Sequence, residues 1–435
     1  MNTNVNTKVQ RLDKKNLYIS LGLFLLDLLF FILIKSKIFK NTDFSIQESL
    51  QPGHSNNNIT TIPTFLKIMN YFNKILFPYS IIIIVNNFSS IYITFILFNI
   101  LSLCCYISSI LKFIFFKTII NSNGIIYYCG EGWNLPCTEM LISVLFYLSL
   151  WNISFKGKQS RTKKILKNIF LVLIIVINIV NAFCLATIGY YLFSHIIFSV
   201  ILGVIIYVFI FETNIIKEHD PKEFCGFIKN KFEKYMIYQI VFLVLSFIPY
   251  IIERIKDNYD DNDIVECKSI DNYFYHKNKS PYITYVDDTF SLLSVFFGHF
   301  FVAIGIKCEL VFVFKNHIQN FEQYHFGVNL DELNMERELK NNTGTIIVTT
   351  DTEWNNTIKI KSIIRLIITF ALSFACFLPY FSMDKNEDID FSQIFLVRYS
   401  LSFALFSFGI TFCFKFIFKV LRLSNEILGS ILNDQ

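Results

Sequence analysis

Charged residues are scarce in this chain of 435 residues. Asp, Glu, Lys and Arg together make up 17% of it, whereas a typical soluble domain has about 25%. The chain also lacks Cys-X-X-Cys pairs, Cys/His clusters at metal-binding spacing, a Gly-rich nucleotide loop and a Gly-X-Ser-X-Gly turn. These absences argue against a soluble fold, a zinc site, a nucleotide-binding domain and a serine hydrolase. We therefore expect neither a metal nor an organic cofactor.

The chain contains many long apolar runs. Hydrophobic residues make up 53% of the chain, in blocks of about 18–25 residues, which is the length that crosses a bilayer as a helix. The sequence predicts an all-α fold, a polytopic transmembrane helical bundle of about nine or ten spans whose main partner is the lipid bilayer. The candidate spans are 17–35, 64–85, 91–111, 138–155, 168–186, 195–211, 236–253, 288–314, 363–381 and 394–418.

The basic residues predict the orientation of these spans. Lys and Arg gather in alternate loops, most densely at 156–167, and such loops face the cytosol. This places both termini in the cytosol and the sequons of Asn58 and Asn278 on the lumenal or exterior side, where we expect glycans. The sequons of Asn341 and Asn355 fall in a cytosolic loop and should stay unmodified. Because the net charge of +5 comes from loop residues, it does not indicate binding to nucleic acid.

Two short segments at lumenal ends of spans contain the residues best suited to chemistry. The first runs from Cys129 to Glu139 and the second from Tyr191 to Gly203. A neutral imidazole at a helix start, as at His195, can attack phosphorus and form a phosphohistidine. A lone His at a membrane edge is, without further context, more often a packing residue beside tyrosines. Glu139 can donate a proton only if burial keeps it protonated, and its other reading is a carboxylate at a helix N-terminus.

The spacing within these segments resembles motifs of the glucose-6-phosphatase branch of the type-2 phosphatidic acid phosphatase superfamily. The matching positions are Cys129, Gly132 and Pro136 in one motif and Tyr191, His195, Val200 and Gly203 in the other. The resemblance implies a lumenal phosphate-ester pocket with His195 as nucleophile. It also implies that Glu139 stands where the family has its proton-donating His. Lys112 and Lys117, at the end of the preceding span, are then candidate phosphate ligands.

The chain departs from the family at several catalytic positions. Gly189 stands where the family has Arg, and Ile119-Ile120 replaces its Arg-Pro pair. Ser199 stands where the family has an acid or amide that orients the nucleophile. Losing one preorganised donor commonly lowers the rate by about 10²–10³. We therefore expect phosphomonoester hydrolysis to be weak or lost, with sugar phosphate, lipid phosphate and polyprenyl pyrophosphate all open as ligands. The alternative is a non-catalytic polytopic protein, such as a transporter subunit, receptor or scaffold.

The resemblance also suggests how the chain is divided. Residues 1–63 would form a cytosolic tail, an extra membrane anchor and a lumenal linker, and 64–420 the glucose-6-phosphatase-like domain. Within that domain we expect 315–362 to be a flexible cytosolic loop, and 421–435 to follow it as a cytosolic tail. The endoplasmic reticulum membrane is the expected location. Asp27 and Arg365 are the main candidates for charges inside spans, and Cys129, Cys137 and Cys267 allow one lumenal disulfide of open pairing.

Overall fold

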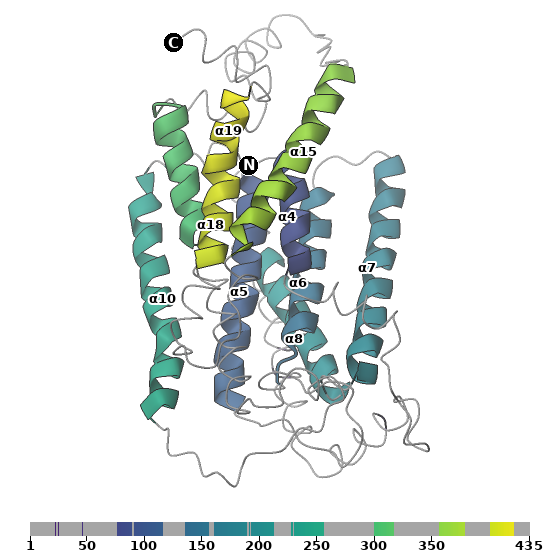
Figure 1. Ribbon diagram of the computed structural model, residues 1–435. Helices are drawn as coiled ribbons and strands as arrows, with labels where there is room; N and C mark the ends of the chain where they lie inside the picture. Colours follow the sequence, from purple (N-terminus) through teal and green to yellow (C-terminus); the bar gives the residue numbers. More distant parts are fainter. Residues whose placement is uncertain are drawn as a thin grey trace, which may run out of the picture. The chain divides into compact units, whose positions relative to one another are not determined.

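The structure is a computed structural model in which every regular element of the described residues is helical (Figure 1). The described residues are 76–88, 91–115, 135–155, 161–188, 191, 193–212, 228, 230–255, 300–316, 356–378 and 401–421, with 22, 25 and 46. The predicted all-α class is confirmed for this part of the chain.

Among the described residues, three helical segments are long and apolar enough to cross a membrane: Ile91–Ser108, Arg161–Thr187 and Phe193–Phe211. Shorter apolar helices cover Phe77–Asn87, Thr138–Ser154 and Ser402–Phe418. These helices are compatible with a helical membrane protein, which is how we treat the chain below. The total of nine or ten spans stays a prediction.

The chain divides into two compact units. Unit 1 comprises Met1–Tyr79, Ile100–Glu218 and Leu243–Phe296, and unit 2 comprises Ser80–Asn99, His219–Phe242 and Phe297–Gln435. Three helices have residues in both units: α4 (Leu76–Phe88), α5 (Ile91–Phe115) and α10 (Phe232–Ile255).

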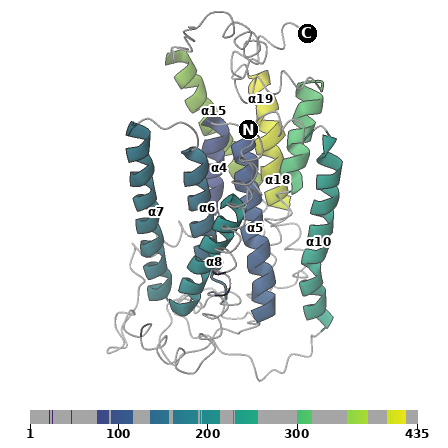
Figure 2. The ribbon, with the colours of Figure 1, turned by 180° about the vertical axis from the view of Figure 1, so that it is seen from behind.

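Unit 1 is centred on α6 (Thr138–Ser154), which packs against both α7 (Arg161–Ile188) and α8 (Phe193–Glu212) (Figure 2). The close approach of α6 and α8 depends on Gly203, because a Cβ there would lie 3.0 Å from Val144 Cγ1. Small residues at helix contacts are the usual means of tight packing in membranes. The core beside this seam consists of Cys137, Met140, Val144, Leu185, Ala186, Tyr191 and Ile196.

Neutral polar side chains join α6 to α7. The hydroxyl of Ser143 donates to Asn178 Oδ1 at 2.8 Å, and Asn181 Nδ2 donates back to the same hydroxyl at 3.2 Å. Toward the other end, Trp151 Nε1 donates to the Lys167 carbonyl at 2.9 Å. Much of the remaining surface of α7 is apolar and exposed, as at Ile169, Val172 and Ile179. Lipid chains would cover such a face.

Unit 2 contains α15 (Asn356–Cys376), a helical stretch at 300–308, and the last helix of the described chain. The stretch at 300–308 continues into a π-helical turn, η2 (Glu309–Val313). The last helix comprises α18 (Ser402–Phe408), a second π-helical turn η4 (Gly409–Cys413), and α19 (Phe414–Val420). Aromatic rings pack in the core of unit 2. The ring centroid of Phe377 lies 5.3 Å from that of Phe403 and 5.4 Å from that of Phe406.

Two close contacts fix the last helix within unit 2. A Cβ added to Gly305 would lie only 1.9 Å from Thr411 Oγ1, so this position has no room for a side chain. Asn86 Nδ2 donates to the Ile410 carbonyl in η4 at 3.3 Å. A π-helical turn disturbs the regular backbone ladder, and here an asparagine side chain satisfies one of its carbonyl groups.

Candidate functional site

The first motif segment ends at the start of α6. This helix begins at Thr138 with Cys137 as its N-cap residue, and Glu139 lies in its first turn. A carboxylate in the first turn interacts favourably with the exposed N–H groups and the helix dipole. The position of Glu139 is compatible with its reading as a carboxylate near a helix N-terminus, although the N-cap residue itself is Cys137. The proposed role of Glu139 as a proton donor remains a prediction.

A hydrogen bond joins the two motif segments. The Tyr191 hydroxyl, just before α8, donates to Glu139 Oε2 at 2.7 Å. The Cys137 thiol lies 3.9 Å from the same oxygen. Hydrogen bonds to a charged acceptor are shorter and stronger than neutral ones, so the contact from Tyr191 fixes the Glu139 carboxyl group. Residues separated by 52 positions in the chain thus form one polar centre.

Ser199 makes a second link between the segments. Its hydroxyl accepts a hydrogen bond from the Cys137 backbone N–H at 2.7 Å and donates to the His195 carbonyl at 2.8 Å. A hydroxyl has a single hydrogen to donate, and that hydrogen points at the backbone rather than at the imidazole. Ser199 therefore links the start of α6 to the first turns of α8 by hydrogen bonds.

His195 lies in the first turn of α8 and is 1% exposed. The contacts of Tyr191 and Ser199 bring this helix start to the start of α6. Two helix N-termini, each equivalent to a partial positive charge, therefore meet at one place. This arrangement favours an anion there, which an ionised Glu139 or an external ligand would supply.

The predicted phosphate ligands, Lys112 and Lys117, lie at or just beyond the end of α5. Ser108 Oγ and Thr138 Oγ1 are 2.6 Å apart, so α5 contacts the first residue of α6. Lys112 follows Ser108 by one turn of α5, which places both residues on the same side of that helix. The side chain of Lys112 and the whole of Lys117 lie outside the described residues, as do Cys129, Cys267, Asn58 and Asn278.

The structure describes one of the two predicted charges inside spans, Arg365, and contains an ion pair that the sequence analysis did not name. Arg365 donates to Ser362 Oγ at 2.8 Å, and Asp27 lies outside the described residues. The structure instead pairs Lys415 with Glu309 at 3.0 Å. Lys415 belongs to α19 and falls within the predicted span 394–418. The available signal was an acidic residue at position 309, inside the predicted span 288–314.

Comparisons with known proteins add no relative to this picture. The chain matches no family model, no curated protein and no solved structure among those searched. Within the described ranges, no group of three His, Cys, Asp or Glu side chains is arranged to hold a metal ion.

Proposed function

We propose that this chain is a glucose-6-phosphatase-like membrane protein with a phosphate-ester pocket in unit 1. The observation that carries the proposal is the hydrogen bond from Tyr191 to Glu139. It joins the two segments whose spacing resembles the family motifs, and its donor Tyr191 precedes His195 by four positions in the chain. The pocket would lie at the paired starts of α6 and α8, with Lys112 and Lys117 contributed from the end of α5.

The reaction at such a site would have two steps. The His195 imidazole attacks phosphorus, the bond to the ester oxygen breaks, and the leaving oxygen takes a proton from a protonated Glu139. Water then attacks the phosphohistidine, and Glu139 accepts the proton that water loses. Sugar phosphates and lipid phosphates share the monoester group that this chemistry requires.

The arrangement of side chains favours slow turnover. Ser199 uses its hydrogen on the His195 carbonyl, so it does not orient the imidazole as an acid or amide would. The missing arginines remove donors that would each be worth about 10²–10³ in rate, although such losses are not additive. An ionised Glu139 would in addition repel a phosphate dianion.

These same contacts favour a second candidate, a non-catalytic membrane protein that keeps the glucose-6-phosphatase-like fold. In this reading Glu139 permanently occupies the anion position between the helix starts, and the contacts from Tyr191 and Ser199 serve only to hold α6 against α8. The protein would then act as a transporter subunit, receptor or scaffold. A fold does not by itself confer an activity.

Phosphate release by membranes expressing the chain tests the proposal. The substrates are glucose 6-phosphate, phosphatidic acid and a polyprenyl pyrophosphate, and the variants are His195→Ala and the bulkier His195→Gln. We expect slow release by the natural chain and none by either variant at equal abundance. Release that is equal in all three proteins on every substrate would contradict catalysis by His195.

Two substitutions of Glu139 separate the candidates further. If Glu139 donates the proton, Glu139→Gln loses activity and Glu139→His, which restores the family's residue, raises it. If Glu139 only fills the anion position, Glu139→Gln should bind inorganic phosphate more tightly than the natural chain does. Tyr191→Phe is the matched control, because it removes the hydrogen bond but keeps the carboxyl group.

The proposed location is the endoplasmic reticulum membrane with cytosolic termini, and glycan mapping tests this orientation. Asn278 should carry a glycan when the chain is expressed in a secretory system, whereas Asn341 and Asn355 should not. Glycans on either of the latter two would reverse the orientation and place His195 in the cytosol.

A further inference from the structure

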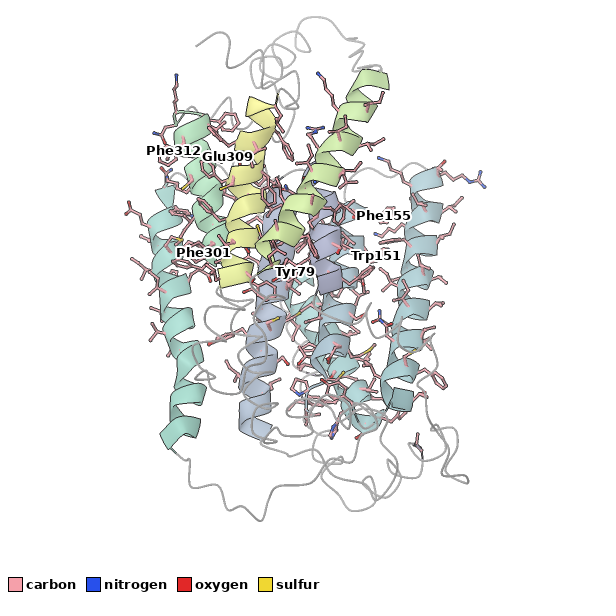
Figure 3. All side chains as sticks on the ribbon, in the orientation of Figure 1. Tyr79, Trp151, Phe155, Phe301, Glu309 and Phe312 are labelled. Carbon is pink, nitrogen blue, oxygen red and sulfur yellow. The ribbon has the colours of Figure 1, made fainter. Side chains whose placement is uncertain are left out.

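A buried ion pair lies in unit 2, whereas the phosphatase-like motifs belong to unit 1. Lys415 Nζ donates to Glu309 Oε2 at 3.0 Å (Figure 3 labels Glu309). The two residues fall within the predicted spans 288–314 and 394–418. Ionisable side chains within spans are costly, and they commonly mark pathways or sites for ions and substrates. The proposed phosphatase chemistry makes no use of this pair.

Both members of the pair adjoin a distorted turn of helix. Glu309 is the first residue of the π-helical turn η2, and Lys415 follows the π-helical turn η4 closely. Such turns are rare and are frequently found at functional sites. In η2 the Phe314 N–H reaches back to the Glu309 carbonyl at 3.2 Å, which is the wider spacing of this geometry. Two independent features, buried charge and altered backbone, therefore coincide.

The two side chains differ in their access to the surface. The side chain of Glu309 is 1% exposed and that of Lys415 is 14% exposed, so the ammonium group is the outer member. A lysine has a long flexible stem and can carry its charge outward to water. Outward movement of Lys415 would uncover a carboxylate oxygen, which is a preferred ligand of hard cations and also a proton acceptor.

We propose that Glu309 is an exchangeable site for a monovalent cation. In this structure the Lys415 ammonium occupies the site, and a proton or a sodium ion replaces it when Lys415 swings outward. Exchange releases the contact between η2 and α19 and so loosens the last helix. The occupant of the site would then control the arrangement of unit 2.

Several other titratable groups lie on the elements that carry the pair and on α15, which packs against the last helix. They are Lys307, Cys308, Lys359, Lys361, Arg365, Cys376, Cys413 and Lys419. Lys307 is engaged elsewhere, since its Nζ donates to the Ile228 carbonyl at 3.3 Å and lies 5.5 Å from the Phe232 ring centroid. Cys308 and Cys413 are half-buried free thiols next to the pair in sequence, so their reactivity can report on it.

The test is maleimide labelling of Cys308 and Cys413 in the purified full-length protein, with each site quantified by mass spectrometry. Sodium chloride replaces choline chloride at constant ionic strength in one arm, and pH is lowered in the other. Each rate is divided by that of Glu309→Gln/Lys415→Met at the same pH, because this variant has the same thiols but no charge pair. We expect the ratio to rise at least about fivefold, within the usual range of coupling between sites.

The outcomes separate the occupants. A rise with sodium identifies an alkali cation site, and a rise with acid alone identifies a proton site. A flat ratio in both arms would overturn the proposal and leave the pair as a fixed structural bridge.

A folding control keeps the result interpretable. Replacing both members of a buried ion pair with uncharged side chains of similar size is often neutral for stability, so the double variant should fold. Lys307→Met removes a neighbouring ammonium and should keep the full cation response. A cation response in the double variant equal to that of the natural chain would contradict a site at Glu309.

Discussion

Unit 1 and unit 2 bury polar groups in opposite ways. In unit 1 the contacts between helices are mostly neutral, from Ser143 to Asn178 and from Ser199 to the Cys137 backbone. In unit 2 a full positive charge meets a full negative charge at Glu309 and Lys415. A neutral contact can be lost at modest cost, whereas a buried charge left alone is expensive. We therefore expect loss of one neutral contact in unit 1 to cost less than loss of one member of the ion pair in unit 2.

Breaking the ion pair should have the largest effect. Lys415→Met leaves the Glu309 carboxylate buried without its ammonium, and we expect the free energy of unfolding to fall by about 3 kcal/mol or more. Glu309→Gln/Lys415→Met should recover most of that loss. Denaturant titration of the purified protein measures both. Equal losses in the single and double variants would show that packing, and not charge, limits the stability of unit 2.

The two tight glycines provide the next comparison. Gly305→Ala places a Cβ 1.9 Å from Thr411 Oγ1, whereas Gly203→Ala places one 3.0 Å from Val144 Cγ1. Overpacking typically costs about 1–3 kcal/mol, and we expect Gly305→Ala at the upper end and Gly203→Ala at the lower end. Thr411→Ala and Val144→Ala should each partly restore the melting temperature of the matching glycine variant. A larger loss for Gly203→Ala would reverse the comparison.

Removing the Ser199 hydroxyl, which links α8 to the start of α6, should have an intermediate effect on stability. Ser199→Ala leaves the buried Cys137 N–H without the oxygen it now bonds, which typically costs about 1–3 kcal/mol. Ser199→Thr, which keeps a hydroxyl, is the conservative control. We expect faster hydrogen exchange at the start of α6 in the alanine variant only. Unchanged exchange there would mean that another group replaces the hydroxyl.

The smallest effect should come from the polar contact between α6 and α7. Hydrogen bonds between membrane helices average about 0.6 kcal/mol in double-mutant cycles. A cycle built from Ser143→Ala and Asn178→Leu should give a coupling energy of that size. A coupling energy as large as that of Glu309 and Lys415 would abolish the contrast between the units.

Hydropathy and spacing predicted part of this picture for clear physical reasons. Apolar run length alone located helices at 91–115, 138–154 and 193–212 to within a few residues, because a helix in lipid must bury every backbone polar group internally. The spacing of Tyr191 and Glu139 within motifs also predicted that their segments share one site. The helix at 76–88 covers the last part of the predicted span 64–85, and 64–75 lies outside the described residues.

The hydrogen-bond and ion-pair partners of individual side chains could not be predicted from hydropathy and spacing. The Ser199 hydroxyl donates to the His195 carbonyl one turn earlier in its own helix, but only the packing of α6 on α8 selects the Cys137 N–H as the donor to Ser199. Glu309 and Lys415 are separated by 106 positions, and the apolar residues around each gave no sign that their helices meet. Helix packing therefore decided both contacts, whereas local sequence decided the helices themselves.

The contact between Trp151 and Lys167 indicates where one surface of the bilayer crosses α6 and α7. The Lys167 ammonium lies 4.7 Å from the Trp151 ring centroid, and Figure 3 labels Trp151 and Phe155 near one end of α6. Tryptophan and lysine favour the water–lipid boundary. From Lys167 to Ile188, α7 rises about 30 Å at roughly 1.5 Å per residue, which is one hydrocarbon thickness.

The opposite boundary therefore falls near Ile188, shortly before Tyr191 and the carboxyl group it contacts. The paired helix starts would lie among lipid headgroups rather than among acyl chains. A phosphate ester bound in the proposed pocket would then arrive by diffusion through water or laterally from the leaflet, without entering the hydrocarbon.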